Sequence, residues 1–256
     1  MSMSGLHVEH HGPPIGLPYV LVHGAPDRSG LFRELLPCLR DRRVVVYDRR
    51  GYGRSLDAPP AHEMIDHSED LLSIVEDCKT PPVVVAHSFG SIPTVLAATL
   101  RRAAFSAVGL WEPPLPWLDW WPEENKTYAA RLAVSTDPGN DIEETYRRLL
   151  GDKTWTGLSP SARARRRAEG RALQIDMAAM LRAPFDLKDV NVPVLVGCGG
   201  ATSVAHDQGA RWLAERLPDA GLRVIEGAGH FAPRTHPREF ASFMREVALL
   251  GPETLQ

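Results

Sequence analysis

The chain has 256 residues, and its 29 Lys and Arg against 32 Asp and Glu give a formal net charge of −3. This balance provides no strong positive field, which argues against the electrostatic attraction that binds proteins to nucleic acids or anionic membranes. We therefore expect a small-molecule substrate as partner, with no nucleic acid and no membrane. The sequence leaves open whether the chain forms a homodimer.

Cysteine usage and the N-terminus indicate the compartment. Cys38, Cys78 and Cys198 include no Cys-x-x-Cys pair, which argues against a disulfide framework and against a zinc site. The first residues lack the basic region and apolar run of a signal peptide, and no segment approaches the roughly 20 apolar residues of a membrane span. We expect a cytoplasmic protein in a reducing compartment.

Short β-branched segments alternate with longer segments whose apolar residues recur at helical spacing. The predicted strands are 19–22, 44–47, 83–85, 107–111, 194–196 and 222–225. The predicted helices are 62–78, 89–101, 205–217 and 236–249. This alternation predicts an α/β fold with a mostly parallel central sheet flanked by helices.

Residues 113–187 interrupt the alternation. They are rich in Trp, Arg and Glu and have helical periodicity but no convincing strand. We interpret this segment as a helical cap inserted into one core, which consists of residues 1–112 and 188–256. The absence of internal repeats and low-complexity linkers supports a single core with an excursion.

The first motif with chemical content is VVVAHSFGS at 83–91, where a predicted strand turns directly into a helix. Small residues at Ala86 and Gly90 flank Ser88, where side chains would clash in a sharp strand-to-helix turn. Ser88 would stand beside the first N–H groups of the helix, which can stabilise negative charge on a carbonyl oxygen. Ser88 is therefore the candidate nucleophile. Ala86 replaces the commoner first glycine of Gly-x-Ser-x-Gly, and a helix N-cap is the alternative role for the serine.

The sequence HGAP, which begins at His23, follows the predicted strand 19–22. Its glycine lets the backbone turn toward Ser88. The N–H groups of Ala25 and Phe89 could then form an oxyanion hole worth roughly 3–4 kcal/mol per donor. Holding this loop by hydrogen bonds is the favoured role of His23, and acting as catalytic base is the less favoured one.

The sequence EGAGHF places His230 on a glycine-flanked loop between the last strand, 222–225, and the last helix, 236–249. Such a loop can carry the imidazole over the carboxyl edge of the sheet to accept the proton of Ser88. His230 is therefore the candidate base. The other histidines, including His206, lack this placement.

Together these motifs resemble the α/β-hydrolase family over nearly the whole chain. The segment DRRGYGRS at 48–55, after the strand 44–47, is similar to a D-x-R-G-x-G-x-S loop of that family. The resemblance implies a Ser-acid-His triad in this chain order. It places the acid on a loop after a strand between the serine and the histidine.

The acid departs from the family's commonest pattern. The loop after strand 194–196 contains no carboxylate before Asp207, which falls where the next helix should already have begun. The family's alternative acid site follows the strand after the nucleophile helix, and there Glu112 ends the strand 107–111. We predict Glu112 as the triad acid, with helix capping or pairing with an arginine as its alternative role.

The zearalenone lactonases look similar to this chain in three respects. These are a glutamate at this strand end, a Gly-Ala-Thr type loop without aspartate, and an H-F-x-x-x-x-H-P tail. A serine nucleophile predicts attack on a carboxylic ester or lactone through an acyl-enzyme, with no metal or organic cofactor. A thioesterase or C–C bond hydrolase on the same triad, and a non-catalytic ligand-sensing protein, are the alternatives.

Substrate specificity is predicted to lie in the cap. Five of the six tryptophans lie between residues 111 and 155, which favours an apolar or aromatic substrate, with cap-to-core packing as the alternative role of each. The side chains predicted to contact the substrate are His23, His87, Trp111, Trp117 and Phe231.

Overall fold

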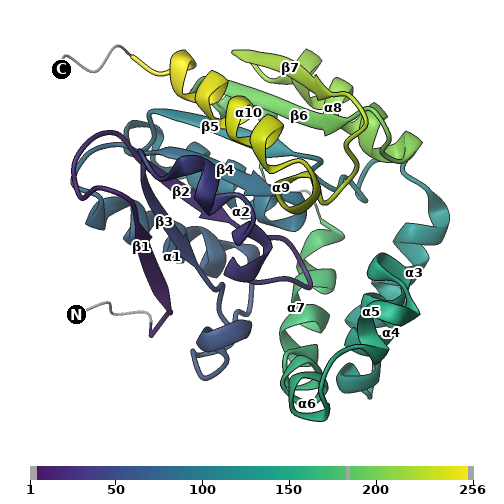
Figure 1. The fold of residues 1–256 in the computed structure, drawn as a ribbon. Coiled ribbons are helices and arrows are strands. Elements are labelled where there is room, and N and C mark those ends of the chain that lie inside the picture. The colour runs from purple at the N-terminus through teal and green to yellow at the C-terminus, as the bar shows by residue number, and fades with distance from the viewer. Residues whose placement is uncertain (1–4, 183–184, 253–256) are drawn as a thin grey trace.

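A seven-stranded sheet forms the centre of the molecule (Figure 1), for which a computed structural model describes residues 5–182 and 185–252. The strand order is β1-β3-β2-β4-β5-β6-β7, with β1 antiparallel to β3 and all other neighbours parallel. The strands are β1 (Val8–His11), β2 (Pro18–Val22), β3 (Arg43–Tyr47), β4 (Val83–His87), β5 (Ala107–Trp111), β6 (Val194–Gly199) and β7 (Ala220–Ile225). The predicted α/β class with a mostly parallel sheet is confirmed.

The central strands β2, β4, β5 and β6 are buried along their whole length. Helices cover both faces of a parallel sheet, so its strands are apolar on both sides and appear in the sequence as continuous apolar runs. β1 has the sequence VEHH and lies at the edge. It shows neither such a run nor a clear alternation, and the sequence analysis did not predict it.

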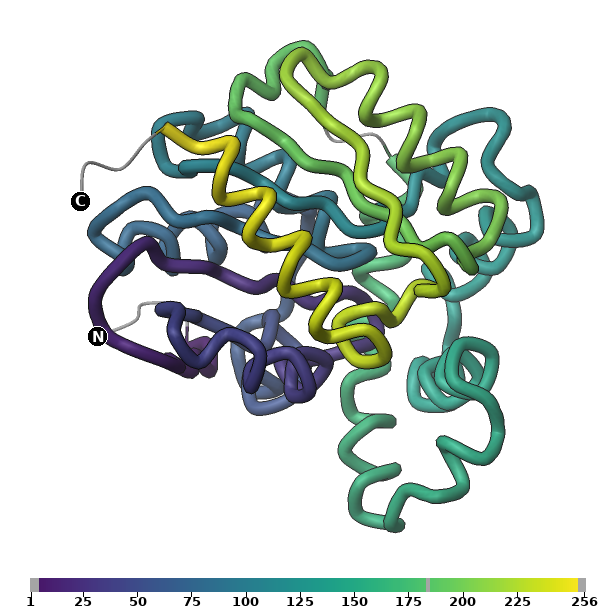
Figure 2. The backbone as a smooth tube through the Cα atoms, turned by 45° about the horizontal axis from the view of Figure 1, so that its top comes forward, coloured from purple at the N-terminus to yellow at the C-terminus, as the bar shows by residue number. Residues whose placement is uncertain are grey.

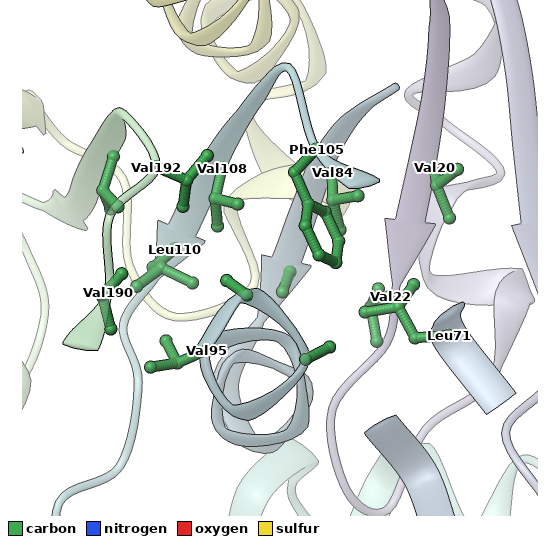
Figure 3. Packing of buried hydrophobic residues seen from close by; sticks show 14 of the residues in the cluster. Val20, Val22, Leu71, Val84, Val95, Phe105, Val108, Leu110, Val190 and Val192 are labelled. Carbon is green, nitrogen blue, oxygen red and sulfur yellow. The ribbon is translucent and has the colours of Figure 1, made fainter. Parts of the chain in front are cut away.

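Helices and short 3-10 turns form a layer on each face of the sheet. On one face α1 (Met64–Asp77), α2 (Ser91–Leu100) and α8 (Val204–Arg216) pack against the strands, and Figure 3 shows Leu71 and Val95 of this layer close to Val22 and Leu110. On the other face lie α10 (Pro237–Leu250) and the 3-10 turns η1 (Ser29–Phe32) and η2 (Leu36–Leu39). α9 (Ala232–Thr235) leads into α10.

In the part of the chain that the structure describes, five α-helices lie between β5 and β6, and we call them the cap. They are α3 (Glu123–Ala133), α4 (Pro138–Leu150), α5 (Asp152–Thr156), α6 (Pro160–Ala168) and α7 (Gly170–Met180). Figures 1 and 2 show them projecting together from one side of the sheet. Leu132, Ile142 and Trp155 of the cap are buried in a cluster that also contains Phe89 of the core. Among residues 5–182 and 185–252, every helix is too short or too polar to span a lipid bilayer.

Candidate active site

Ser88 lies in a tight turn between β4 and α2. Its φ of 52° is in the left-handed region, which is disfavoured for residues other than glycine. Close packing holds this turn, because a Cβ atom on Gly90 would lie 2.6 Å from the carbonyl oxygen of His23. Ala86, at the other flanking position, is fully buried in β4. A serine kept in a strained strand-to-helix turn is the arrangement of a nucleophile elbow.

The loop that begins at His23 packs directly against this turn. A Cβ atom on Gly24 would lie 2.9 Å from Cβ of Ser88, so glycine is needed for this approach. Ala25 and Phe89 line the same cavity as Ser88. Nδ1–H of His23 donates to the Gly24 carbonyl at 2.7 Å, and its Nε2 accepts from the N–H of Arg49 at 2.8 Å. Burial lowers the pKa of His23 well below its usual value, and the neutral ring fits one donor and one acceptor contact.

Glu112 and His230 form a buried hydrogen-bonded pair. Nδ1–H of His230 donates to Oε2 of Glu112 at 2.7 Å, and the N–H of Gly199 donates to Oε1 at 2.9 Å. Glu112 is fully buried and follows β5 with a φ of 47°. Burial lowers the pKa of His230 to about 4. At neutral pH the imidazole is therefore uncharged, and with Nδ1–H bound to Glu112 its Nε2 can accept a proton.

The backbone of His230 is also fixed. Its carbonyl oxygen accepts from Nε2–H of His87 at 2.8 Å and from Nε1–H of Trp111 at 3.1 Å. Burial lowers the pKa of His87 to about 3, so this ring is neutral as well. Two side chains at the ends of β4 and β5 thus hold the loop that carries the candidate base.

His206, which the sequence analysis set aside, lies against His230. The two rings stack with centroids 4.6 Å apart and planes at 16°, and Nδ1 of His206 is 3.7 Å from Oε2 of Glu112. His206 lies in the first turn of α8, after the loop where the family resemblance places the usual acid. This position, next to the usual acid loop, was the sequence signal that could have identified His206 as a neighbour of the candidate base. Glu112, His206 and His230 present possible ligand atoms within 4.8 Å of one another. The two rings are stacked face to face, however, so their in-plane lone pairs run side by side and do not converge on one ion.

Asp207, the alternative acid, is one residue further along α8. Its Oδ1 and Oδ2 each accept from Nε of Arg211 at 3.1 Å. Its side chain is 39% exposed, whereas Glu112 is fully buried. The acid in contact with His230 is Glu112.

A cavity of about 560 Å³ lies between the cap and the carboxyl edge of the sheet, and both Ser88 and His230 line it. Its apolar wall comes mainly from the cap and the turns beside it. The larger apolar side chains on it are Phe89, Trp121, Leu149, Leu173, Met177, Met180 and Phe231, and the smaller ones are Ala25, Pro114, Pro116, Ala129 and Ala201. Polar groups gather on α3 and α4, namely Glu124, Asn125, Tyr128, Thr145 and Arg148. This volume accommodates a drug-sized molecule.

Among the five predicted substrate contacts, Phe231 is on the wall of this cavity, and the other four have different surroundings in the described structure. His23 is enclosed by backbone groups, and His87 faces a second, small cavity of about 20 Å³ beside Ala25. Trp111 packs against Phe240 and Phe243 of α10, and Trp117 packs edge-on against Phe185. His23, His87 and Trp111 lie at the buried ends of β2, β4 and β5 and support the site from behind, whereas Trp117 lies in the turn that follows β5. The wall of methionines and polar groups from the cap was not predicted from the sequence.

Comparisons with known proteins agree with this architecture. The model of the alpha/beta hydrolase family matches residues 19–243. A Mycobacterium tuberculosis (strain H37Rv) protein named probable oxidoreductase EphD is 39% identical over 95% of this chain, which spans about half (48%) of that relative's length. The non-heme chloroperoxidase of Streptomyces lividans is 30% identical, with 88% of this chain and 89% of the relative aligned. Among solved structures, a thermophilic esterase from Thermogutta terrifontis is 25% identical, has a TM-score of 0.73, and aligns over 96% of this chain and 94% of its own.

Proposed function

The chain belongs to the alpha/beta hydrolase family, and we propose that it hydrolyses carboxylic esters or lactones of small apolar molecules through an acyl-enzyme. The observation that carries the proposal is the 2.7 Å hydrogen bond from His230 to the buried Glu112, at a cavity that Ser88 also lines. A neutral imidazole held by a carboxylate beside a strained serine is the arrangement that activates a hydroxyl for attack.

In the proposed reaction, Oγ of Ser88 attacks the carbonyl carbon while Nε2 of His230 takes the hydroxyl proton. The Glu112 carboxylate stabilises the resulting imidazolium. The former carbonyl oxygen, now negatively charged, accepts hydrogen bonds from the N–H groups of Ala25 and Phe89. The imidazolium then gives its proton to the leaving alkoxide oxygen. His230 then takes a proton from water as the water attacks the acyl group. The second tetrahedral intermediate breaks its bond to Oγ of Ser88, which takes that proton back from His230, so that the acid is released and both side chains return to their starting state. In a lactone, the leaving hydroxyl stays in the same product molecule.

The cavity supports an apolar acyl group or ring. Its wall is mostly apolar, with Trp121, Met177 and Phe231 among the larger side chains, and burial of apolar surface contributes about 25 cal/mol per Å². The Thermogutta terrifontis relative is described as a thermophilic esterase. The reaction class proposed for this chain is consistent with that description.

Two measurements test the proposal. A fluorophosphonate should label Ser88 stoichiometrically, as identified by peptide mass spectrometry, and should not label Ser88→Ala. A panel of p-nitrophenyl esters of increasing acyl length, aliphatic and aromatic lactones, and thioesters should give steady turnover on esters or lactones. Labelling without turnover on any of these, or a single turnover that stops, would favour a ligand-sensing protein over an enzyme.

A further inference from the structure

A buried ion pair joins the cap to the core close to the candidate oxyanion hole. Asp176, on α7 of the cap, accepts from Arg49 at 2.7 Å (Oδ2) and 3.3 Å (Oδ1), and both side chains are 1% exposed. Tyr52 and His67 of the core also contact this carboxylate, at 2.8 and 3.0 Å. Burial alone would raise the pKa of Asp176, but Arg49 and His67 lower it below its usual range, so the group is a carboxylate.

Arg49 uses its remaining donors on the loop that faces Ser88. Its Nη2 donates to the carbonyl oxygen of Gly24 and its Nε to that of His23, both at 3.1 Å. Its guanidinium also lies over the ring of Phe89, 4.5 Å from the centroid. Arg49 therefore contacts both segments whose N–H groups form the candidate oxyanion hole.

The contact with Gly24 determines the direction of one oxyanion donor. The carbonyl of Gly24 and the N–H of Ala25 belong to the same planar peptide unit, and in a trans peptide they point in opposite directions. Because Arg49 and His23 both donate to that carbonyl, they hold it on the side away from the Ala25 N–H. Fixed donors of this kind stabilise an oxyanion without reorganising during the reaction.

We propose that Asp176 of the cap is a positioning residue, which holds Arg49 against the Gly24–Ala25 peptide and so completes the oxyanion hole only when α7 is docked on the core. This inference rests on the proposed hydrolase function. It adds that the cap contributes to the chemical step as well as to substrate binding. An Arg49 without its carboxylate would be a buried unpaired cation, which is strongly unfavourable, so its guanidinium would move or recruit water.

The test compares Asp176→Asn, which keeps the shape of the side chain and removes its charge, with Glu169→Gln as a matched control. Glu169 is another buried cap carboxylate paired with a core arginine, Arg28, and it has no contact with the Gly24 or His23 carbonyls in the described structure. For each variant we would measure kcat and KM on the best ester, and the affinity of a trifluoromethyl ketone. Oγ of Ser88 adds to the carbonyl carbon of such a ketone and forms a tetrahedral adduct with a negatively charged oxygen.

We expect Asp176→Asn to lower kcat about 10- to 100-fold and to weaken the ketone by a similar factor, with KM changed less than about threefold. Glu169→Gln should stay within about threefold of the wild type in all three. Arg49→Lys keeps the charge but cannot reach Gly24, His23 and Asp176 together, so it should reproduce the loss even if Asp176→Asn folds poorly.

If the wild type hydrolyses ester, two results would overturn the inference. One is an unchanged affinity for the ketone in Asp176→Asn or in Arg49→Lys. The other is a loss in Glu169→Gln equal to that in Asp176→Asn. A wild type that neither hydrolyses esters or lactones nor binds the ketone would instead contradict the proposed function, and the inference with it.

Discussion

The carboxyl edge of the sheet and the cap contribute to one cavity in different ways. At the sheet edge, Ser88 and Glu112 directly follow β4 and β5, and His230 lies on the loop after β7. Hydrogen bonds and close backbone packing fix each of them. The cap contributes side chains such as Met177 and Met180, which touch the cavity through apolar surface.

This difference separates two kinds of substitution. A change at the sheet edge should alter the chemical step for every substrate, because the reacting groups are the same each time. A change in the cap wall should alter which substrate is preferred, because apolar contacts discriminate by size and shape.

Ser88→Ala should lower kcat/KM by about 10⁴-fold or more on every ester or lactone that the wild type hydrolyses, because no other group replaces the nucleophile. The folded state should persist, since the substitution removes one oxygen atom at the cavity wall. Steady-state kinetics and a thermal melt by circular dichroism measure both. Turnover that survives in Ser88→Ala would rule out a serine mechanism.

His230→Ala should lose a factor comparable to that of Ser88→Ala, because serine and histidine act as one unit. The double variant Ser88→Ala/His230→Ala should then be no more than a few-fold slower than either single variant. A double variant whose losses multiplied would show that the two side chains work independently, which contradicts the proposed serine–histidine mechanism.

Glu112→Gln should lower kcat about 10²- to 10⁴-fold, since the amide keeps the packing but can favour the wrong imidazole tautomer. Because a carboxylate stabilises the imidazolium, its removal should lower the pKa of His230 further below about 4. The acidic limb of the kcat/KM profile, where the base becomes protonated, should therefore move to lower pH. Profiles from pH 3.5 to 8 for both enzymes measure the shift.

Asp207→Asn is the control for the acid, because its partner in the structure is Arg211. It should retain activity within about threefold of the wild type. A crippled Asp207→Asn beside an active Glu112→Gln would reverse the assignment of the acid.

The sheet edge could be predicted from the sequence because its geometry is local. The Ser88 turn and the loop at His23 each depend on a few neighbouring residues, so short motifs indicated them. Glu112 was predicted from the family's alternative acid position, at the end of the strand 107–111. The stacking of His206 on His230 joins residues from separate elements, and no short motif encodes it. Strand β1, at the side of the sheet, was also not predicted, because its sequence VEHH contains no apolar run.

The cap is the opposite case. Helical periodicity predicted its helices, but an amphipathic helix shows which residues are apolar and not which partner they meet. Met177 faces the cavity, whereas Trp117, an equally apolar candidate, packs against Phe185. Only the docking of α3, α4 and α7 decides between the two environments.

Met177→Ala should test the cap side of the division. Removing this buried side chain enlarges the cavity, so the preference for long over short acyl chains should rise about 10-fold, while hydrolysis of the acetyl ester should change less than about threefold. Val134→Ala, at a cap residue that is 79% exposed, should leave the acyl-length profile unchanged. The ratio of kcat/KM across the p-nitrophenyl series measures both. A Met177→Ala enzyme slowed equally on all esters would mean that this part of the cap acts on chemistry.

The smallest expected effect concerns stability at the sheet edge, where His87 is buried with its pKa lowered to about 3. The unfolded chain binds a proton at this residue below about pH 6.5, and the folded protein does not, so the contribution of His87 to stability falls as the pH is lowered through this window. The variant His87→Asn lacks this titrating group.

The free energy of unfolding of the wild type minus that of the variant should therefore decrease by at most about 1.4 kcal/mol per pH unit between pH 6.5 and 4.5. Other titrating groups are common to both proteins and cancel in the difference. Urea unfolding at pH 7.5, 6.5, 5.5 and 4.5 measures it, and a difference independent of pH would mean that His87 can be protonated in the folded protein.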